Sequence, residues 1–294
     1  MSKLRKAPTT AEASTTGVYD TVATRSAGVV IDAYSTSFGW ACRLLGRPVR
    51  DDVRAVYALV RVADEIVDDI EVDLNAAERD RLLTELEQQV DDAVKCGRSS
   101  NLVVHAFART ARRFQIGPDL VDPFFASMRT DLTATEHDAA SFARYVHGSA
   151  EVVGLMCLRV FVGGDDAAYA RLGPGAARLG AAFQKINFLR DLGDDHDARG
   201  RSYFPGLDVA AFDDARRNAL LDDIDADLAA AATAIDDLPR SSRVAVRCAH
   251  HLFAELSRRL RATPATELRA RRVRVPGPAK ARLIVGVLLL EGLR

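Results

Sequence analysis

Along most of this chain, apolar residues recur at intervals of three and four, the spacing that gives a helix one continuous apolar face. Sustained alternation of apolar and polar residues, which would indicate β-strands, is scarce. The segments are rich in Ala, Leu, Arg and Glu, which are good helix formers. The pattern predicts an all-α bundle without a sheet.

Glycine and proline divide the chain into segments of helix length, because both residues interrupt helices. The predicted breaks lie at 46–48, 97–100, 117–118, 163–164, 173–175, 205–206, 239, 264 and 276–278. We therefore expect a succession of helices with short connections.

The segment 55–70 is apolar almost all round, which predicts a helix buried in the middle of the bundle. Its polar exceptions are Tyr57, Arg61, Asp64 and Asp68. They follow one another at steps of four, three and four, so they form a single stripe on the helix surface. We expect this stripe to face inward, with a cation one turn before the carboxylates.

The segment 183–195 repeats this arrangement, with apolar residues on the remaining faces of a predicted helix. Its polar stripe consists of Gln184, Asn187, Asp191 and Asp194 or Asp195. The sequence therefore predicts two central helices that each turn a polar stripe inward.

Carboxylates four residues apart share a helix face, with Cβ atoms about 5–6 Å from each other. Asp64 with Asp68, and Asp191 with Asp195, would each form a platform of carboxylate oxygens. Mg²⁺ typically binds one or two protein carboxylates and completes its shell with water and phosphate oxygens. Two facing platforms could therefore hold a diphosphate through bridging metal ions.

Two plainer interpretations of these acidic pairs remain. Carboxylates at this spacing are common on solvated helix faces, and ion pairs with Arg61 and Arg190 would form a purely structural network. Burial of several carboxylates in an apolar helix, however, costs several kcal/mol per ion unless cations compensate. That cost favours a functional role.

A glycine-containing loop, residues 197–205, directly follows the second acidic cluster. It carries Arg199, Arg201 and Tyr203. Guanidinium groups suit phosphate oxygens because their fork geometry allows bidentate contacts. We expect this loop to act as a flap that places one of the two arginines over a metal-bound diphosphate.

With 294 residues, 48% of them hydrophobic, the chain can bury a large core. We expect one all-α domain over residues 21–294, after a flexible polar tail at residues 1–20. The formal net charge of −1 gives no indication of nucleic-acid binding. The region Arg258–Arg282 is strongly basic, which indicates a solvated helix face or a contact with a membrane.

No feature of the sequence predicts secretion or a membrane span. Residues 1–16 lack the apolar core of a signal peptide, and the apolar run Leu283–Leu290 is far shorter than the roughly 20 residues that a spanning helix needs. The four cysteines show no metal-ligand spacing, as is typical of buried thiols in a reducing compartment. We expect a cytoplasmic protein, either soluble or peripheral to a membrane.

Several ordered motifs resemble those of the squalene/phytoene synthase family, the head-to-head prenyl diphosphate synthases. Residues 34–38 are similar to its early Ser-x-Ser-Phe flap, residues 57–69 and 184–195 to its two aspartate-rich motifs, and residues 201–205 to its trailing loop. Three more stretches resemble the bacterial phytoene synthases within the family, namely 128–135, 145–154 and 271–276. The resemblance covers most of the chain.

The resemblance implies a helical bundle of the isoprenoid synthase type with a central cavity. It also implies a Mg²⁺-dependent prenyltransferase, with Mn²⁺ as a substitute metal. Such an enzyme would condense two geranylgeranyl diphosphates head-to-head into 15-cis-phytoene and release two diphosphates, in carotenoid biosynthesis. NADPH is not expected.

Residue roles are implied where the motifs match. The implied metal ligands are Asp64, Asp68, Asn187, Asp191 and Asp195. Catalysis would depend on Asp64, Asp68, Asp191, Asp195 and Arg61. Substrate would be bound by Ser35, Ser37, Phe38, Tyr57, Arg61, Tyr145, Gln184, Arg190, Arg201 and Tyr203. Aromatic faces that could stabilise a carbocation belong to Phe38, Phe183, Phe188, Tyr145 and Tyr203.

Three alternatives stay open, and the plainest is a helical interaction protein whose two acidic stripes are solvated. A squalene or dehydrosqualene synthase would use farnesyl diphosphate in place of the C20 substrate, and a noncatalytic relative would serve as an assembly or lipid-binding factor. The chain also departs from the family at Glu151, where a small residue is usual, and at Thr266, where many members have a tyrosine. Neither departure touches the aspartate-rich motifs.

Overall fold

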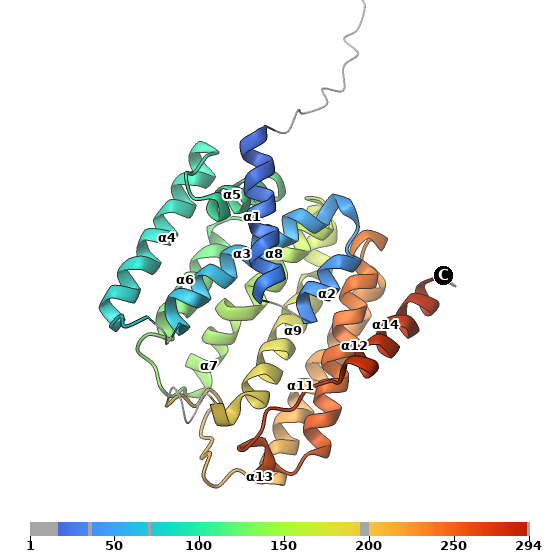
Figure 1. Cartoon of the computed structure of the whole chain (residues 1–294). Helices are drawn as coiled ribbons and strands as arrows, with labels where there is room; N and C mark the ends of the chain where they lie inside the picture. Colours follow the sequence, from blue (N-terminus) through green and yellow to red (C-terminus); the bar gives the residue numbers. More distant parts are fainter. Residues whose placement is uncertain (1–16, 35–36, 70–71, 195–199, 293–294) are drawn as a thin grey trace, which may run out of the picture.

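The computed structural model describes residues 17–34, 37–69, 72–194 and 200–292, apart from the side chains of Ser37 and Phe38. These residues form helices that pack into one bundle (Figure 1). The helices are α1 (Val18–Tyr34), α2 (Ser37–Leu44), α3 (Arg47–Asp68), α4 (Ala76–Cys96), α5 (Leu102–Phe114), α6 (Pro118–Thr130), α7 (Ala139–Val146), the π-helix η1 (His147–Glu151), α8 (Val152–Phe161), α9 (Asp166–Arg190), α11 (Asp214–Asp236), α12 (Arg240–Ala262), α13 (Ala265–Leu268) and α14 (Gly277–Gly292). The prediction of an all-α fold is confirmed for this part of the chain.

Helix α3 is the central helix that its apolar sequence predicts. It begins after Gly46, with Pro48 in its first turn, where the missing N–H of proline costs nothing. It contacts α1, α4, α5, α6, α8 and α12, so its apolar residues are covered on several sides. The helix ends at Asp68, where Asp69 adopts an extended conformation. Both carboxylates of the first stripe therefore lie in its last two turns.

Helix α9 runs through a predicted break, and that prediction was wrong. Residues 173–175 lie inside the helix, including Pro174, although an internal proline usually costs about 3 kcal/mol. The glycine on its C-terminal side has a packing reason, because a Cβ at Gly175 would overlap Ala234 of α11. The other predicted breaks coincide with helix ends or loops.

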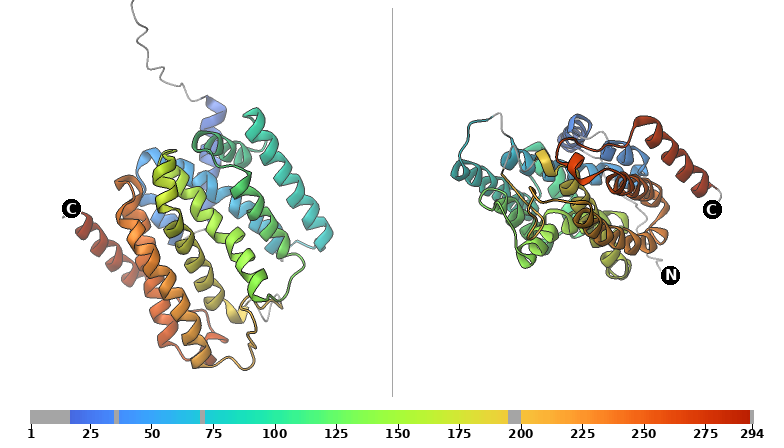
Figure 2. Two further views of the ribbon diagram at one scale, coloured as in Figure 1. Left: turned by 180° about the vertical axis from the view of Figure 1, so that it is seen from behind. Right: turned by 90° about the horizontal axis from the view of Figure 1, so that it is seen from below.

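Two large groups of buried side chains make up most of the interior. One surrounds α3 and includes Phe107, Phe124 and Phe125. The other surrounds α9, α11 and α12 and includes Leu221 and Ile224. Full burial of each such side chain stabilises the fold by roughly 1.5–3 kcal/mol. The views from behind and from below show α11 and α12 beside α9, with α14 on the outside of α12 (Figure 2).

Two further features bear on function. The only bridge of β type among the described residues joins Glu136 to Ser202, and the Ser202 N–H donates to the Thr135 carbonyl over 2.8 Å. This bridge ties the loop after α9 to the loop after α6.

None of the helices described here has the length and apolar character to cross a bilayer.

Candidate active site

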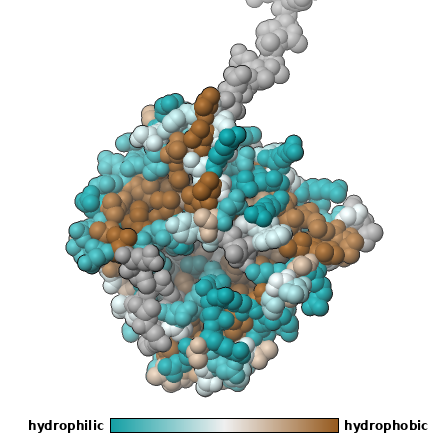
Figure 3. All heavy atoms as spheres, in the orientation of Figure 1, coloured by the Kyte–Doolittle hydropathy of each residue, from teal (hydrophilic) through white to brown (hydrophobic). Residues whose placement is uncertain are grey.

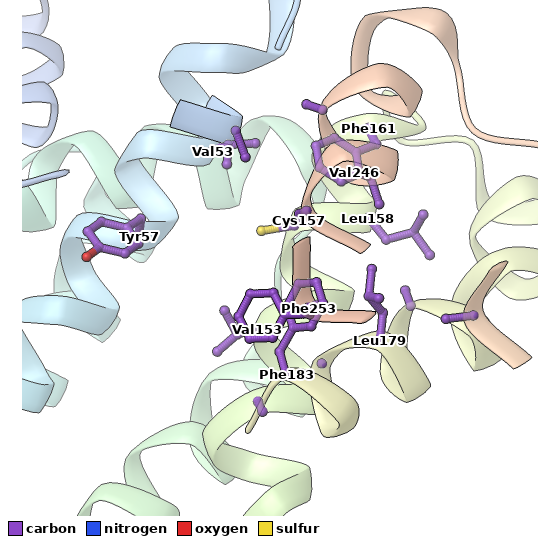
Figure 4. Close-up of a pocket in the computed structure, with 18 of the residues that line it drawn as sticks. Val53, Tyr57, Val153, Cys157, Leu158, Phe161, Leu179, Phe183, Val246 and Phe253 are labelled. Carbon is purple, nitrogen blue, oxygen red and sulfur yellow. The ribbon is translucent and has the colours of Figure 1, made fainter. Parts of the chain in front are cut away.

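A cavity of about 520 Å³ lies in the middle of the bundle. Its walls come from α2, α3, η1, α8, α9, α11 and α12, and most of its lining side chains are apolar (Figure 4). The cavity follows α9 from Leu172 to Arg190, about 27 Å at 1.5 Å per residue. The central cavity expected from the resemblance is therefore present.

Polar groups gather at the end of this cavity where α9 ends. Tyr57 of α3 and Gln184, Asn187 and Arg190 of α9 all line it there. Tyr57, Gln184 and Asn187 belong to the two predicted stripes, so the fold brings part of each stripe to one cavity, and Arg190 joins them from the last turn of α9. We call this end, together with the acidic residues that follow on α3 and α9, the polar mouth. The rest of the cavity is the apolar chamber.

The α3 side of the polar mouth carries two half-buried carboxylates. Arg61 Nη1 lies 2.6 Å from Asp64 Oδ2, and its other terminal nitrogen pairs with Glu65. Its guanidinium carbon lies 4.6 Å from the centroid of the Tyr34 ring, which also lines the cavity. Arg61 therefore holds Asp64 and Glu65 while it stacks on an aromatic side chain at the mouth.

Asp68 is paired with an arginine that lies 133 residues later in the chain. Arg201 Nη1 lies 2.8 Å from Asp68 Oδ1, and Nη2 donates to the Asp131 carbonyl oxygen over 2.7 Å. The Arg201 side chain is only 12% exposed. The loop after α9 is thus fastened to the last turn of α3, on the side where the flap was expected. Arg199, the other predicted flap arginine, lies outside the described residues.

The α9 side of the mouth differs from its prediction. The expected continuous helix over 183–195 is wrong, because α9 ends at Arg190 and Asp191 caps it. Beyond this bend the chain packs closely on a distant segment, since a Cβ at Gly193 would overlap the Arg269 carbonyl oxygen. Asp194 is exposed, and Asp195 lies outside the described residues.

Asp191 has two arginine partners. Arg190 Nε donates to Oδ1 over 2.8 Å, and Arg272 Nε lies 2.6 Å from the same oxygen. Arg272 belongs to the basic region Arg258–Arg282, for which the sequence predicts a solvated helix face or a contact with a membrane. Arg272 instead contacts the second acidic cluster. Arg61 and Arg190 both form the ion pairs that a purely structural network would require, and Arg190 also lines the cavity.

A buried aspartate, which the sequence analysis did not assign to the site, joins these elements. Asp131 caps α6 and accepts hydrogen bonds of 2.8 Å at both carboxylate oxygens from the Tyr145 hydroxyl. Burial raises the pKa of Asp131 to about 7, although Arg201 and the Tyr145 hydroxyl both favour its charged form. The sequence signal was weak because a single aspartate after a helix is ordinary; only the fold brings Arg201 and Tyr145 to it.

The aromatic candidates divide into two groups. Phe183 lines the chamber and stacks on Phe253 of α12, with ring centroids 3.8 Å apart (Figure 4). Tyr145, Phe188 and Tyr203 instead stack on one another, with 4.0 Å between the centroids of the last two. This second group is buried beside Asp131 and does not line the cavity within the described residues. Of the described aromatic candidates, Phe183 is the one placed to face a substrate chain.

The donor atoms at the mouth suit a hard divalent cation. Carboxylate oxygens come from Asp64, Asp68 and Asp191, and an amide oxygen comes from Asn187. Mg²⁺ prefers such oxygen ligands and needs only one or two carboxylates when phosphate oxygens share its shell. Within the described ranges, no group of three or more His, Cys, Asp or Glu side chains is close enough to hold a metal by itself. These oxygen donors are of the type that Mg²⁺ binds when phosphate oxygens complete its shell.

Several predicted residues take no described part in this geometry. Ser35 lies outside the described residues, and Ser37 and Phe38 belong to α2 without described side chains. Glu151, the first departure from the family, pairs with His147 at 2.9 Å on the π-helix. Thr266, the second, is exposed on α13.

Comparison with known proteins settles the family. Residues 31–279 match the squalene/phytoene synthase family. The chain belongs to this family. The resemblance drawn from the motifs is thereby confirmed, and the family consists of head-to-head prenyltransferases.

Relatives within the squalene/phytoene synthase family include phytoene synthases of bacteria. The chain is 33% identical over 174 residues to the phytoene synthase of Mycobacterium tuberculosis, a match that covers 58% of this chain and 53% of the relative. It is 31% identical over 245 residues to the phytoene synthase of Cereibacter sphaeroides, covering 75% and 66%. A 4,4'-diapophytoene synthase of Staphylococcus haemolyticus is 29% identical over 206 residues, covering 66% and 67%.

Solved structures of the squalene/phytoene synthase family share the fold. A dehydrosqualene synthase superposes with a TM-score of 0.78 at 20% identity, covering 94% of this chain and 98% of that one. A squalene synthase from Alicyclobacillus acidocaldarius superposes with a TM-score of 0.71 at 18% identity, covering 84% and 95%. The bundle is therefore the all-α isoprenoid synthase fold that the motifs implied.

Proposed function

We propose that this protein is a phytoene synthase that condenses two geranylgeranyl diphosphates head-to-head into 15-cis-phytoene, with release of two diphosphates. The observation that carries the proposal is the cavity, an apolar chamber whose polar end is lined by Tyr57, Gln184, Asn187 and Arg190, beside the ion-paired carboxylates of α3 and α9. Such a shape accepts a long hydrocarbon chain at one end and a diphosphate at the other. The phytoene synthase relatives that exceed 30% identity support the C20 substrate.

The residues of the mouth divide the work of binding a diphosphate. Asp64, Asp68, Asn187, Asp191 and Asp195 would hold Mg²⁺ or Mn²⁺. When bound, the metal would stabilise the negative charge that grows on the leaving diphosphate. Arg61 and Arg190, now paired with carboxylates at the mouth, carry guanidinium forks that match diphosphate oxygens. Tyr57 and Gln184 add hydrogen-bond donors on the cavity wall.

The loop residue Arg201 is a positioning group. It joins Asp68 to Asp131 through contacts of 2.8 and 2.7 Å, so it fixes the loop after α9 against the last turn of α3. Loop closure of this kind excludes water, which would otherwise quench a carbocation. Ser35 and Ser37 would close the mouth from a second flap.

The chamber has a separate role. Apolar walls bind the isoprenoid chains and keep water from the reacting carbons. The stacked faces of Phe183 and Phe253 provide electron-rich surfaces beside those chains. Cys42 and Cys157 also line the chamber, and burial raises the pKa of each thiol to about 12, so both stay neutral in the apolar wall.

The deciding experiment is product analysis with purified protein. Geranylgeranyl or farnesyl diphosphate is incubated with protein and Mg²⁺, without NADPH, and the hydrocarbon is identified by mass spectrometry. We expect phytoene from the C20 substrate and no product after chelation of the metal by EDTA. A C30 hydrocarbon from farnesyl diphosphate alone would reject the C20 assignment. No product from either substrate, with or without NADPH, would reject the enzyme and leave a noncatalytic assembly or lipid-binding factor.

A second candidate is a dehydrosqualene synthase that joins two farnesyl diphosphates. It is favoured by the 4,4'-diapophytoene synthase relative and by the dehydrosqualene synthase with a TM-score of 0.78. The same mouth would serve this reaction, since only the length of the chain in the chamber differs. A squalene synthase would add a reduction step, so a product that appears only with NADPH would identify that activity.

A further inference from the structure

A second, smaller cavity lies directly beside the chamber. It has a volume of about 180 Å³ and is lined by residues of α2, α12 and α14, among them Trp40, Leu44 and Ile284. Ala41 and Ala249 line both cavities. The wall between the two is therefore made of side chains that end at Cβ, the smallest barrier that residues other than glycine can form.

The outer wall of this second cavity is α14, whose solvent face is apolar. Val285, Leu288, Leu289 and Leu290 are 45–64% exposed, and Trp40 on neighbouring α2 is 57% exposed. The space-filling view shows this brown surface over α14, at the right of the molecule (Figure 3). Single exposed apolar residues are ordinary, but four on one helix beside an exposed tryptophan form a patch.

The charges of α14 are distributed asymmetrically. Its one acidic residue, Glu291, is 4% exposed and pairs with Arg243 at 3.1 Å and Arg247 at 2.7 Å, both on α12. Of its two cationic residues, Lys280 lines the second cavity, whereas Arg282 is exposed to solvent. The outer face of α14 therefore combines apolar side chains with a cationic one and shows no acidic group, which suits a lipid surface with anionic headgroups.

We propose that this outer face, formed by α14 and Trp40, rests on a lipid bilayer. The second cavity is then the route by which the hydrocarbon product leaves the chamber for the bilayer, through the two-alanine wall. The inference deepens the proposed function and rests on it for the identity of that product. A hydrocarbon that has lost its diphosphate has no favourable path through a charged mouth, whereas a bilayer offers an apolar medium.

The lipid contact is tested without any assay of activity. The full chain is sedimented with vesicles of phosphatidylcholine mixed with phosphatidylglycerol. Leu288→Glu/Leu289→Glu should weaken binding at least about 10-fold, because each leucine loses its burial in the bilayer. The matched control is Val18→Glu/Val22→Glu, which places the same charges on exposed valines near the start of α1, away from α14 (Figure 1). We expect the control to bind as the unchanged protein does.

The route is tested by comparing single and multiple turnovers in the presence of these vesicles. Ile284→Trp and Leu44→Trp each fill the second cavity from a different helix, and neither residue lines the chamber. Both variants should form hydrocarbon normally when protein exceeds substrate, since no product needs to leave. With substrate in excess, their turnover should fall several-fold while vesicle binding stays unchanged. Circular dichroism confirms that each variant is folded.

Three results would overturn the inference. Unchanged vesicle binding by Leu288→Glu/Leu289→Glu would show that this face makes no lipid contact. Failure of the unchanged protein to bind vesicles, with a dimer that this variant splits in analytical ultracentrifugation, would assign the face to a second copy of the chain. Normal multiple turnover in both tryptophan variants would reject the route. Absence of hydrocarbon even in a single turnover of the unchanged protein would contradict the proposed function instead, and the sedimentation result would still decide the lipid contact.

Discussion

At the polar mouth of the cavity, charged side chains hold one another, whereas in the apolar chamber helices approach until backbone meets backbone. Asp64, Asp68 and Asp191 each pair with at least one arginine. On the chamber wall, a Cβ at Gly180 would overlap the Ala150 carbonyl oxygen. Partly exposed ion pairs contribute little to stability, and their side chains can exchange partners. Closely packed helices contribute much more to stability, and their backbones have no room to rearrange.

Because the two regions are held together differently, substitutions in them should affect different properties of the protein. Changes at the mouth should affect turnover and leave folding largely intact, because its ion pairs are partly exposed. Changes on the chamber wall should alter stability or the choice of substrate length. Asp131 combines features of both regions, because its side chain is buried as in the chamber and is ionisable as at the mouth.

The largest expected effect is on turnover at the mouth. Asp64→Ala should lower kcat at least about 100-fold, because one carboxylate of the metal platform is lost. Its helical circular dichroism should remain unchanged. Asp92→Ala on the exposed face of α4 is the matched control and should have normal kinetics. Near-normal turnover of Asp64→Ala would show that this carboxylate holds no metal.

The pH dependence of stability tests Asp131. An aspartate in an unfolded chain titrates near pH 3.9, and the pKa of Asp131 in the folded protein is raised to about 7. Between these values the folded state binds the additional proton, so the contribution of Asp131 to stability falls as the pH rises from about 4 to about 7, by a few kcal/mol.

The measurement is the free energy of unfolding in urea across this pH range. Asp131→Asn keeps a polar side chain of the same size without the charge, and it should flatten the profile. If the free energy of unfolding of Asp131→Asn changed with pH as steeply as that of the unchanged protein, the titrating group would be a residue other than Asp131.

Close packing at the chamber wall predicts opposite effects of the same substitution. Gly180→Ala should destabilise the protein by about 1–3 kcal/mol, because the added Cβ meets the Ala150 carbonyl oxygen. Gly286→Ala on α14 should stabilise it by about 0.5–1 kcal/mol, since no atom lies within 4 Å of that Cβ and alanine favours a helix. Thermal unfolding measures both. Equal effects at the two positions would contradict the contrast between wall and surface.

The smallest effect is on substrate length. Val246 of α12 lines the chamber together with Phe161, and Val246→Phe would shorten the space for a chain (Figure 4). We expect kcat/KM for the C20 substrate to fall about 10-fold relative to the C15 substrate, as for other changes of a few carbons in an apolar pocket. Val244→Phe adds the same ring on α12 outside the cavity and should leave the ratio unchanged. A ratio unaffected by Val246→Phe would exclude this wall as a determinant of length.

The polar stripes were predictable because they depend on helical spacing alone. Tyr57 of the first stripe and Gln184 and Asn187 of the second do line one cavity, as inward-facing stripes require. The end of the second stripe was not predictable, since α9 stops at Arg190 where residue 193 packs on a distant segment. Local sequence carries no signal of such an approach.

By itself, the sequence determined the helical class of this protein, its family and most residues of the polar mouth. Spacing within one helix encodes which side chains share a face, and ordered motifs encode the family. Tertiary structure alone decided that Asp131 joins Arg201 and Tyr145, and that Arg272 reaches Asp191. It also decided that two alanines separate the chamber from a cavity under α14. These contacts join residues distant in the sequence, so they depend on how whole helices pack and not on the period of any one helix.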